Sequence, residues 1–220
     1  MQTITIAFTP EGPTDERFLS SIITRTIEDI LTEHGRGEFT VLPPMSFSRV
    51  KGSLNGAEKL LEVARRVKGY HFLIIHADAD DSNSNNAMNE RIKPGADLIR
   101  SDSSSCQDLV PLVPVHMSES WMFADPDMLR ELLNTQLDLT SDLGLPRPSH
   151  AERPANPKEL LANAIRISQS NTGRRKRTQL RISDLYAQFS EIDLNKLNII
   201  PSYQIFRNEL IKTLRSLNFI

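Results

Sequence analysis

Three aspartates follow directly after a continuous apolar run, and together they could bind a metal ion. The run covers residues 71–76 and leads into Asp78, Asp80 and Asp81. Because side chains alternate along a strand, we expect Asp78 and Asp80 to point the same way and Asp81 the other. Neighbouring carboxylates repel one another unless a cation or a proton offsets their charge. Such hard oxygen ligands suit Mg²⁺ or Mn²⁺, so the pattern favours a metal site, with Asp81 as a further ligand, over an acidic turn.

Glu11 is another acidic candidate, because it follows the first predicted strand, residues 4–8. In open α/β sheets, ligands bind outside the carboxyl ends of the strands. The adjacent Gly12 permits a tight turn at this position. An isolated Glu-Gly pair would be a solvated turn, but Glu11 could complete a triad with Asp78 and Asp80. We therefore predict these three acids as catalytic residues and metal ligands.

Three more side chains could line the same edge of the sheet. His76 lies two residues before Asp78, on its side of the strand, and could be a ligand or a supporting partner. The alternative is a buried, hydrogen-bonded histidine without a role in binding. His116 and Glu119 lie at the end of a later predicted strand, residues 109–117, and could line the same rim.

Contacts with nucleic acid would have to come from a local basic patch. The chain has 26 Lys and Arg against 28 Asp and Glu, a net charge of −2, so no global field would hold it on a polyanion. The sequence contains one dense basic run, formed by Arg174, Arg175, Lys176 and Arg177. We predict that this run binds nucleic acid with salt-sensitive affinity; the alternative is a solvated loop or helix start.

Several classes of protein are excluded by what the sequence lacks. A single cysteine, Cys106, excludes an internal disulfide framework and a cysteine-rich zinc site. No Gly-x-x-x-x-Gly-Lys-Ser/Thr loop and no Gly-x-Ser-x-Gly elbow is present. No apolar run approaches the roughly 18 residues of a membrane span, and the N-terminus has no basic leader. We expect a soluble, cytoplasmic protein without membrane contact.

The elements that must position these residues alternate between strand and helix. Hydrophobic periodicity predicts strands over residues 4–8, 38–45, 71–76 and 109–117, and helices over residues 14–33, 55–67 and 121–133. This alternation predicts an α/β fold with a mostly parallel sheet. We expect a catalytic domain over residues 1–140, a proline-rich connection over 141–157 and a helical extension over 158–220. The polar residues 81–108, which could include a helix at residues 87–91, are expected to form a loop or a mobile helical cover.

The order strand, Glu-Gly, helix and a later strand ending in Asp-x-Asp resembles the TOPRIM domain. Topoisomerases, primases and nucleases of the overcoming-lysogenization-defect (OLD) type share this domain, and the likeness lies in residues 8–19 and 74–80. The chain is more similar to an uncharacterised bacterial TOPRIM-like branch whose members are often partnered with an ATPase. That likeness extends to residues 117–125, 156–161 and 191–197.

This resemblance implies a Rossmann-like TOPRIM domain with Mg²⁺-dependent chemistry on phosphodiesters. Glu11 would be the acid or base near the scissile phosphate, and Asp78 and Asp80 would hold the metal. The chain has three tyrosines and little room for a domain that carries a tyrosine nucleophile, so water is the expected nucleophile. We expect a nuclease acting on DNA or RNA, as the effector of an anti-phage system with an ATPase partner.

Two other functions fit part of the pattern. The chain could be a non-catalytic subunit whose helical tail docks on an ATPase. It could also be a nucleotide-sugar transferase, because those enzymes use a strand-end Asp-x-Asp to hold a metal and a diphosphate, but Glu11 and Gly12 have no role in that function. The tail helices could also support a homo-oligomer, although no heptad repeat specifies its size.

Overall fold

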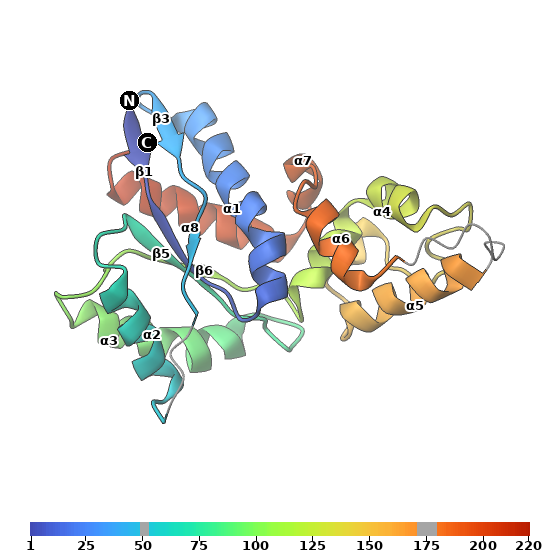
Figure 1. Cartoon of the computed structure of the whole chain (residues 1–220), viewed down its shortest axis with the longest axis horizontal. Helices are drawn as coiled ribbons and strands as arrows, with labels where there is room; N and C mark the ends of the chain where they lie inside the picture. Colours follow the sequence, from blue (N-terminus) through green and yellow to red (C-terminus); the bar gives the residue numbers. More distant parts are fainter. Residues whose placement is uncertain (49–52, 171–179) are drawn as a thin grey trace.

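The computed structural model describes residues 1–48, 53–170 and 180–220 (Figure 1). The predicted nucleic-acid-binding run, Arg174, Arg175, Lys176 and Arg177, lies outside these residues. The strands are β1 (Gln2–Ile4), β2 (Ile6–Thr9), β3 (Phe39–Val41), β4 (Met45–Ser46), β5 (Phe72–His76) and β6 (Leu109–Leu112). The α-helices are α1 (Pro13–His34), α2 (Gly56–Arg66), α3 (Lys93–Arg100), α4 (Pro126–Leu133), α5 (Pro157–Ser170), α6 (Ile182–Phe189), α7 (Leu194–Leu197) and α8 (Pro201–Ser216). None of the helices in these ranges is long and apolar enough to cross a membrane.

The main sheet has four parallel strands in the order β4-β2-β5-β6. Phe8 of β2 lies opposite Ile74 of β5, which lies opposite Val110 of β6. Every residue of β2 and β5 is buried, as expected for parallel strands that are covered on both faces. β1 and β3 form a separate two-stranded parallel sheet. The predicted α/β fold with a mostly parallel, Rossmann-like sheet and C-terminal helices is therefore confirmed.

Helices cover both faces of the main sheet, and successive residues of β5 alternate between two hydrophobic cores. Phe72 and Ile74 belong to a large core with residues of α1 and α8. Leu73 and Ile75 belong to a smaller core with residues of α2 and α3. Figure 1 shows the two pairs of helices on opposite sides of the strands. This arrangement leaves the carboxyl ends of the strands as the edge where polar side chains can gather.

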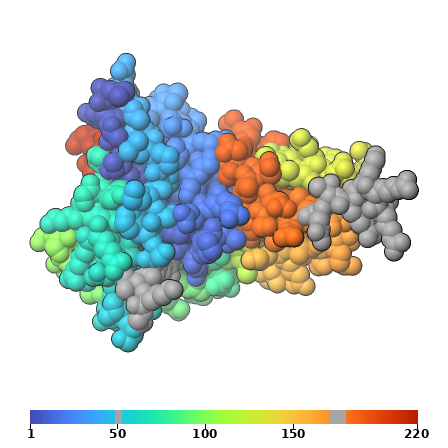
Figure 2. Space-filling view, viewed as in Figure 1, coloured from blue at the N-terminus to red at the C-terminus, as the bar shows by residue number. Residues whose placement is uncertain are grey.

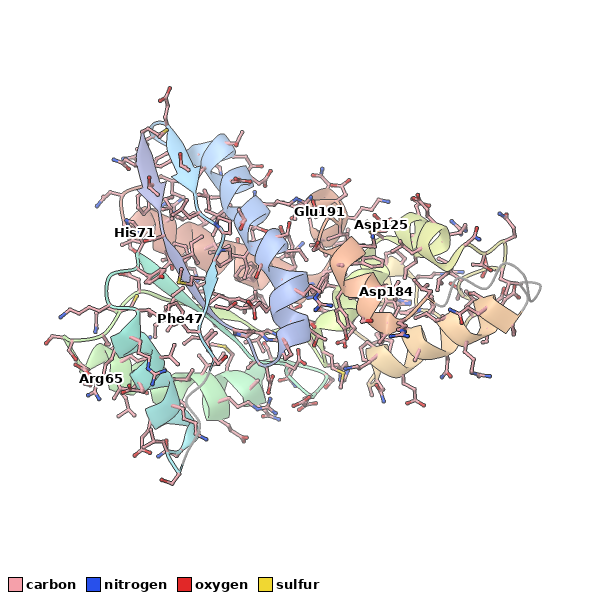
Figure 3. All side chains as sticks on the ribbon, viewed as in Figure 1. Phe47, Arg65, His71, Asp125, Asp184 and Glu191 are labelled. Atoms are coloured by element: carbon pink, nitrogen blue, oxygen red, sulfur yellow. The ribbon has the colours of Figure 1, made fainter. Side chains whose placement is uncertain are left out.

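The C-terminal helices contribute to two parts of the molecule. Helices α4, α5 and α6 form a lobe beside the sheet, where Asp125 and Asp184 lie (Figure 3). In the space-filling view, the surface of α6 adjoins that of α1 (Figure 2), and the two helices are in contact. Helix α8 instead packs against β6. Residues 158–220, predicted as one helical extension, therefore supply one helix of the α/β layers as well as part of the lobe.

Residues 81–108 contain a helix where the sequence offers one, at residues 87–91, and a further helix after it. They form a π-helix, η1 (Ala87–Ile92), which continues directly into α3. Helix α3 packs closely on α2, and Gly95 is what allows this approach, because a β-carbon there would lie 2.7 Å from Leu60 Cδ1. Ala96 and Ile99 are the apolar residues that α3 buries, too few to produce a clear periodic pattern.

Three predicted elements are divided or shorter than expected, and one of them is the strand over residues 38–45, of which β3 covers residues 39–41. The predicted helix over residues 121–133 is divided into a 3₁₀ helix, η2 (Ser118–Ala124), and α4. The division falls at Asp125, whose carboxylate caps α4 by accepting two backbone hydrogen bonds. The predicted strand over residues 109–117 ends at Leu112. Its continuation turns at His116, which has a φ of 58°.

Candidate metal centre at the carboxyl ends of the strands

The candidate site lies at the edge where β2 and β5 end. These strands are paired in parallel, so the segments that follow them meet in space. β2 leads through Glu11 and Gly12 into α1, and β5 leads into Asp78. Gly12 caps α1 with extended backbone, and the first turn of the helix carries Asp15, which is 8% exposed. Asp15 therefore joins the residues that the sequence pattern predicts at this edge.

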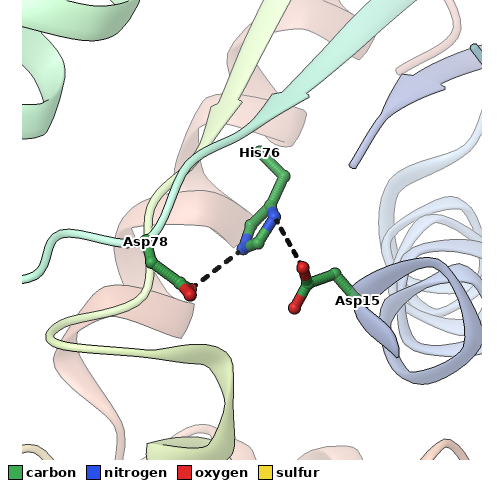
Figure 4. A group of neighbouring side chains, drawn as sticks. All are labelled: Asp15, His76 and Asp78. Carbon is green, nitrogen blue, oxygen red and sulfur yellow. Dashed lines mark ion pairs between the residues drawn. The ribbon is translucent and has the colours of Figure 1, made fainter. Parts of the chain in front are cut away.

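His76, the last residue of β5, is fully buried between the carboxylates of Asp15 and Asp78 (Figure 4). Its Nδ1 accepts a hydrogen bond from the backbone N–H of Glu11 at 3.3 Å and lies 3.9 Å from Asp15 Oδ2. Its Nε2 lies 3.3 Å from Asp78 Oδ1. Each ring nitrogen therefore faces one carboxylate, Nδ1 toward Asp15 and Nε2 toward Asp78. The imidazole thus links the two carboxylates.

Ser118, the first residue of η2, fixes both aspartates from the other side. Its backbone N–H donates to Asp78 Oδ1 at 3.0 Å, and its hydroxyl donates to Asp15 Oδ1 at 2.9 Å. The backbone N–H of Gly12 donates to Asp15 Oδ2 at 3.0 Å. The cluster is therefore held by three segments that are distant in the sequence, which gives it a preorganised geometry.

The electrostatics of this cluster favour a bound cation. Burial raises the pKa of Asp78 above its ordinary value, although the hydrogen bond and the charge of His76 partly oppose the rise, and the nearby charges of Asp15 and Glu119 add to it. One ligand atom each from Asp15, His76 and Asp78 lies within 4.8 Å of the other two. Two carboxylates suit Mg²⁺ and Mn²⁺, and an imidazole shifts the preference toward transition metals. Mn²⁺ satisfies both demands, so these residues fit the predicted divalent ion.

The predicted triad is brought together in part. The Glu11 carboxylate lies beside Asp78 and accepts a hydrogen bond from the backbone N–H of Asp78 at 2.9 Å. Among the described residues, however, the group within 4.8 Å includes neither Glu11 nor Asp80. The expectation that Asp78 and Asp80 share a direction from strand alternation is wrong, because β5 ends at His76 and Asp80 has a φ of 52°. The left-handed backbone turns the exposed Asp80 side chain to a different partner.

That partner is Arg91, which projects from the π-helix η1 onto the rim of the site. Its Nη2 donates to Asp80 Oδ2 at 2.6 Å, and its Nη1 donates to the backbone oxygen of Asp78 at 3.0 Å. The same Nη1 lies 3.7 Å from Glu11 Oε1. The hydrogen bond to Asp80 is the main cause that raises the pKa of Arg91, with the negative charge of Glu11 contributing. The sequence pattern did not single out Arg91 as a site residue.

Asp81 and His116 have mainly local roles. The carboxylate of Asp81 accepts hydrogen bonds from the backbone and hydroxyl of Ser82 and from the side-chain amide of Asn86. These bonds lower the pKa of Asp81 and occupy both of its oxygens, so it closes a turn rather than facing the ligand group. His116 is buried, and its backbone pairs with Asp80 and Asp81. Both pairs join the loop after β5 to the loop after β6.

Glu119 adds a further buried carboxylate next to Ser118. It is 4% exposed and accepts a hydrogen bond from the hydroxyl of Tyr186 on α6. Lys158 Nζ on α5 lies 3.8 Å from the same Glu119 oxygen. Burial, and then the bond to Glu119, raise the pKa of Tyr186, which keeps its hydroxyl protonated as a donor. The helical lobe thus reaches the edge of the acidic cluster through two side chains.

Replacing Tyr186 with Phe should destabilise the protein, because it leaves the buried Glu119 without its hydroxyl donor. Removing one partner of a buried hydrogen bond costs about 1–3 kcal/mol. We expect a fall of about 2–4 °C in melting temperature for each kcal/mol lost, measured by calorimetry. Tyr70→Phe is the matched control, since the Tyr70 hydroxyl donates to Met45 Sδ in an exposed position and not to a buried carboxylate. Equal melting temperatures for the two variants would contradict this role of Tyr186.

Comparisons with known proteins identify a family but no activity. No curated protein and no solved structure matches the chain. The model of one family, described as a domain of unknown function, DUF4276, matches residues 10–211. That match contains Glu11, the whole acidic cluster, Arg91 and the helical lobe. Because it covers most of the 220 residues, the chain belongs to the DUF4276 family.

Proposed function

We propose that this chain is a TOPRIM-like, metal-dependent nuclease that hydrolyses phosphodiester bonds in nucleic acids. The observation that carries the proposal is the cluster of Asp15, His76 and Asp78, with Glu11 beside it, at the carboxyl ends of parallel strands. Such an edge is where open α/β sheets bind ligands. A cation would offset the charge of these closely spaced carboxylates, of which Asp15 is buried and Asp78 partly buried.

Each residue of the cluster has a distinct part in the proposed chemistry. Asp15, His76 and Asp78 would hold the divalent ion, which supplies a more acidic water and stabilises charge on phosphoryl oxygens. Glu11 is anchored by the Asp78 backbone N–H, and its side chain is 37% exposed. It can therefore reach a substrate and exchange a proton with the attacking or leaving oxygen. Ser118 keeps both aspartates oriented while this occurs.

The proposal predicts that Glu11→Gln abolishes most of a metal-dependent cleavage activity. Labelled DNA and RNA strands are incubated with the protein in Mn²⁺ or Mg²⁺, and products are resolved by electrophoresis. Because an amide cannot act as acid or base, we expect the rate to fall by about 10²-fold or more. Asp97→Asn is the matched control, as Asp97 pairs with Arg100 on the exposed face of α3. Cleavage that is equal in both variants would refute the role of Glu11.

The wild-type result separates this proposal from the alternatives. A non-catalytic subunit would cleave neither strand in any metal but would co-purify with an ATPase. A nucleotide-sugar transferase would show a thermal shift with nucleotide sugars and no cleavage. An ATPase partner and a defence role, which the resemblance implies, are proposed for this chain on the same basis. The lobe of α4, α5 and α6 is the surface that such a partner could contact without covering the strands.

A further inference from the structure

The roles proposed above for the carboxylates do not account for the position of Arg91. It lies on a π-helix, a rare element that is frequent at functional sites. Its guanidinium reaches both loops at the edge of the sheet, through Glu11 after β2 and Asp80 after β5. It pairs with both of these acids, and its side chain is 37% exposed. It is therefore both charge-paired and accessible to a ligand.

The present contacts of Arg91 hold its side chain in one position, but they are weak enough for a ligand to replace them. The Asp80 carboxylate is 52% exposed, and ion pairs at such positions contribute little, about 0–1 kcal/mol. The 3.7 Å approach to Glu11 is longer than a hydrogen bond. Two hydrogen bonds hold the guanidinium at the sheet edge, one to the backbone oxygen of Asp78 at 3.0 Å and one to the exposed Asp80 carboxylate at 2.6 Å. A ligand that offers two phosphate oxygens would match the planar fork of the guanidinium better than these partners do.

We propose that Arg91 is the counter-ion of Glu11 and Asp80 in the ion-free protein. When a divalent ion binds, Arg91 exchanges these carboxylates for the phosphate of a substrate. This inference rests on the proposed function and names its anion subsite: the ligand is a phosphodiester whose non-bridging oxygens pair with Arg91. The exchange is driven by the change in charge around Arg91. A divalent cation at Asp78 offsets the negative charge that now holds Arg91, while the phosphate brings new negative charge to the same rim.

The proposal predicts effects of opposite sign on cation and substrate. In Arg91→Ala, the loss of a competing positive charge should tighten Mn²⁺ binding by about 3–10-fold at low ionic strength. The loss of a charge-assisted partner should raise the KM for an oligonucleotide by about 10–100-fold, with a smaller change in kcat. Mn²⁺ affinity is measured on the protein alone by titration calorimetry, and KM and kcat by initial rates of cleavage.

Two further variants keep the test decisive. Arg91→Lys retains the charge but not the fork, so it should bind Mn²⁺ like the wild type and raise KM by an intermediate factor. Arg100→Ala removes an exposed arginine of α3 that pairs with Asp97, and both measurements should stay unchanged. A structural role for Arg91 would instead weaken Mn²⁺ binding and lower kcat in Arg91→Ala, with a lower melting temperature.

The possible failures are distinguishable. Wild-type protein that binds no Mn²⁺ and cleaves nothing would overturn the proposed function, and the subsite with it. Wild-type protein that binds Mn²⁺ and cleaves, together with an Arg91→Ala variant whose Mn²⁺ affinity is unchanged or weaker, would overturn the counter-ion role alone. An Arg91→Ala variant that binds Mn²⁺ more tightly but keeps the wild-type KM would overturn the phosphate subsite alone.

Discussion

Asp78→Asn is expected to eliminate divalent-ion binding while making the ion-free protein more resistant to heat. Asp78 is the acid that the sequence pattern predicts as a metal ligand and that the structure places in the candidate metal centre. Its carboxylate is largely buried, and burial raises its pKa, so the ionised form is costly in the folded protein. The asparagine oxygen can still accept the Ser118 N–H bond. Removing the charge should therefore raise the stability of the ion-free protein at pH 7 by on the order of 1 kcal/mol.

The same substitution removes the negative charge that a cation needs. We expect Mn²⁺-dependent cleavage to fall by more than about 10³-fold, since a metal site loses a ligand and half of its carboxylate charge. Stability and activity then change in opposite directions. This pattern is expected of a residue that is needed for function although it lowers the stability of the folded protein.

The stabilising effect should depend on pH in one direction. An acid whose pKa is raised in the folded protein binds protons more tightly there than in the unfolded chain. The cost of its charge is therefore absent below the ordinary carboxyl value near 3.8 and appears as the pH rises through the folded-state pKa. Asparagine cannot ionise. The advantage of Asp78→Asn over the wild type should be present at pH 7 and vanish toward pH 4.

Calorimetry in the presence of a chelator measures this difference across the pH range. Asp81→Asn is an informative control, because hydrogen bonds lower the pKa of Asp81. That group stabilises the folded protein in its charged form, so its replacement should lower the melting temperature at pH 7. An ion-free Asp78→Asn protein that melts below the wild type at pH 7 would show that Asp78 has a structural role instead.

The central part of the fold could be predicted from local patterns. The apolar run at residues 71–76 and the helical spacing of residues 14–33 correspond closely to β5 and α1. The first is a continuous apolar run bounded by polar residues, and the second is a long segment with clear helical periodicity. Helix α3 could not be predicted in this way, because it buries few apolar side chains and its packing on α2 depends on Gly95.

Sequence patterns could predict the site residues that follow directly after a strand. They could not predict the residues whose position in the site depends on tertiary contacts. Glu11, His76 and Asp78 follow from the position of β2 and β5. Asp15 had the pattern of an ordinary acid in the first helical turn, and only the start of α1 at Pro13 brings it to His76. Arg91 had no local signal, since its role depends on where η1 packs. The left-handed backbone of Asp80 could not be inferred from strand alternation.

Deleting residues 201–220 is expected to prevent folding of the whole chain rather than to remove a separable extension. Helix α8 packs on β6, and six apolar side chains of this segment are buried, namely Tyr203, Phe206, Leu210, Leu214, Phe219 and Ile220. Burial of such side chains contributes about 1.5–3 kcal/mol each, or roughly 9–18 kcal/mol in total. The net stability of a domain is only about 5–15 kcal/mol. The sheet face below α8 would also be exposed to water.

Two point variants on the same helix show whether this packing, rather than chain length, is responsible. Phe206→Ala removes a fully buried ring that packs near Trp121 and should cost about 3–5 kcal/mol. Ile205→Ala, at a neighbouring position that is 54% exposed, should change stability by less than about 0.5 kcal/mol. Denaturant unfolding followed by circular dichroism measures both. Because β6 lies beside β5, whose end carries His76, loss of α8 packing should also weaken Mn²⁺ binding at the candidate metal centre. A chain ending at residue 200 that unfolds cooperatively and still binds Mn²⁺ would instead show that the strand edge is organised without its C-terminal helix.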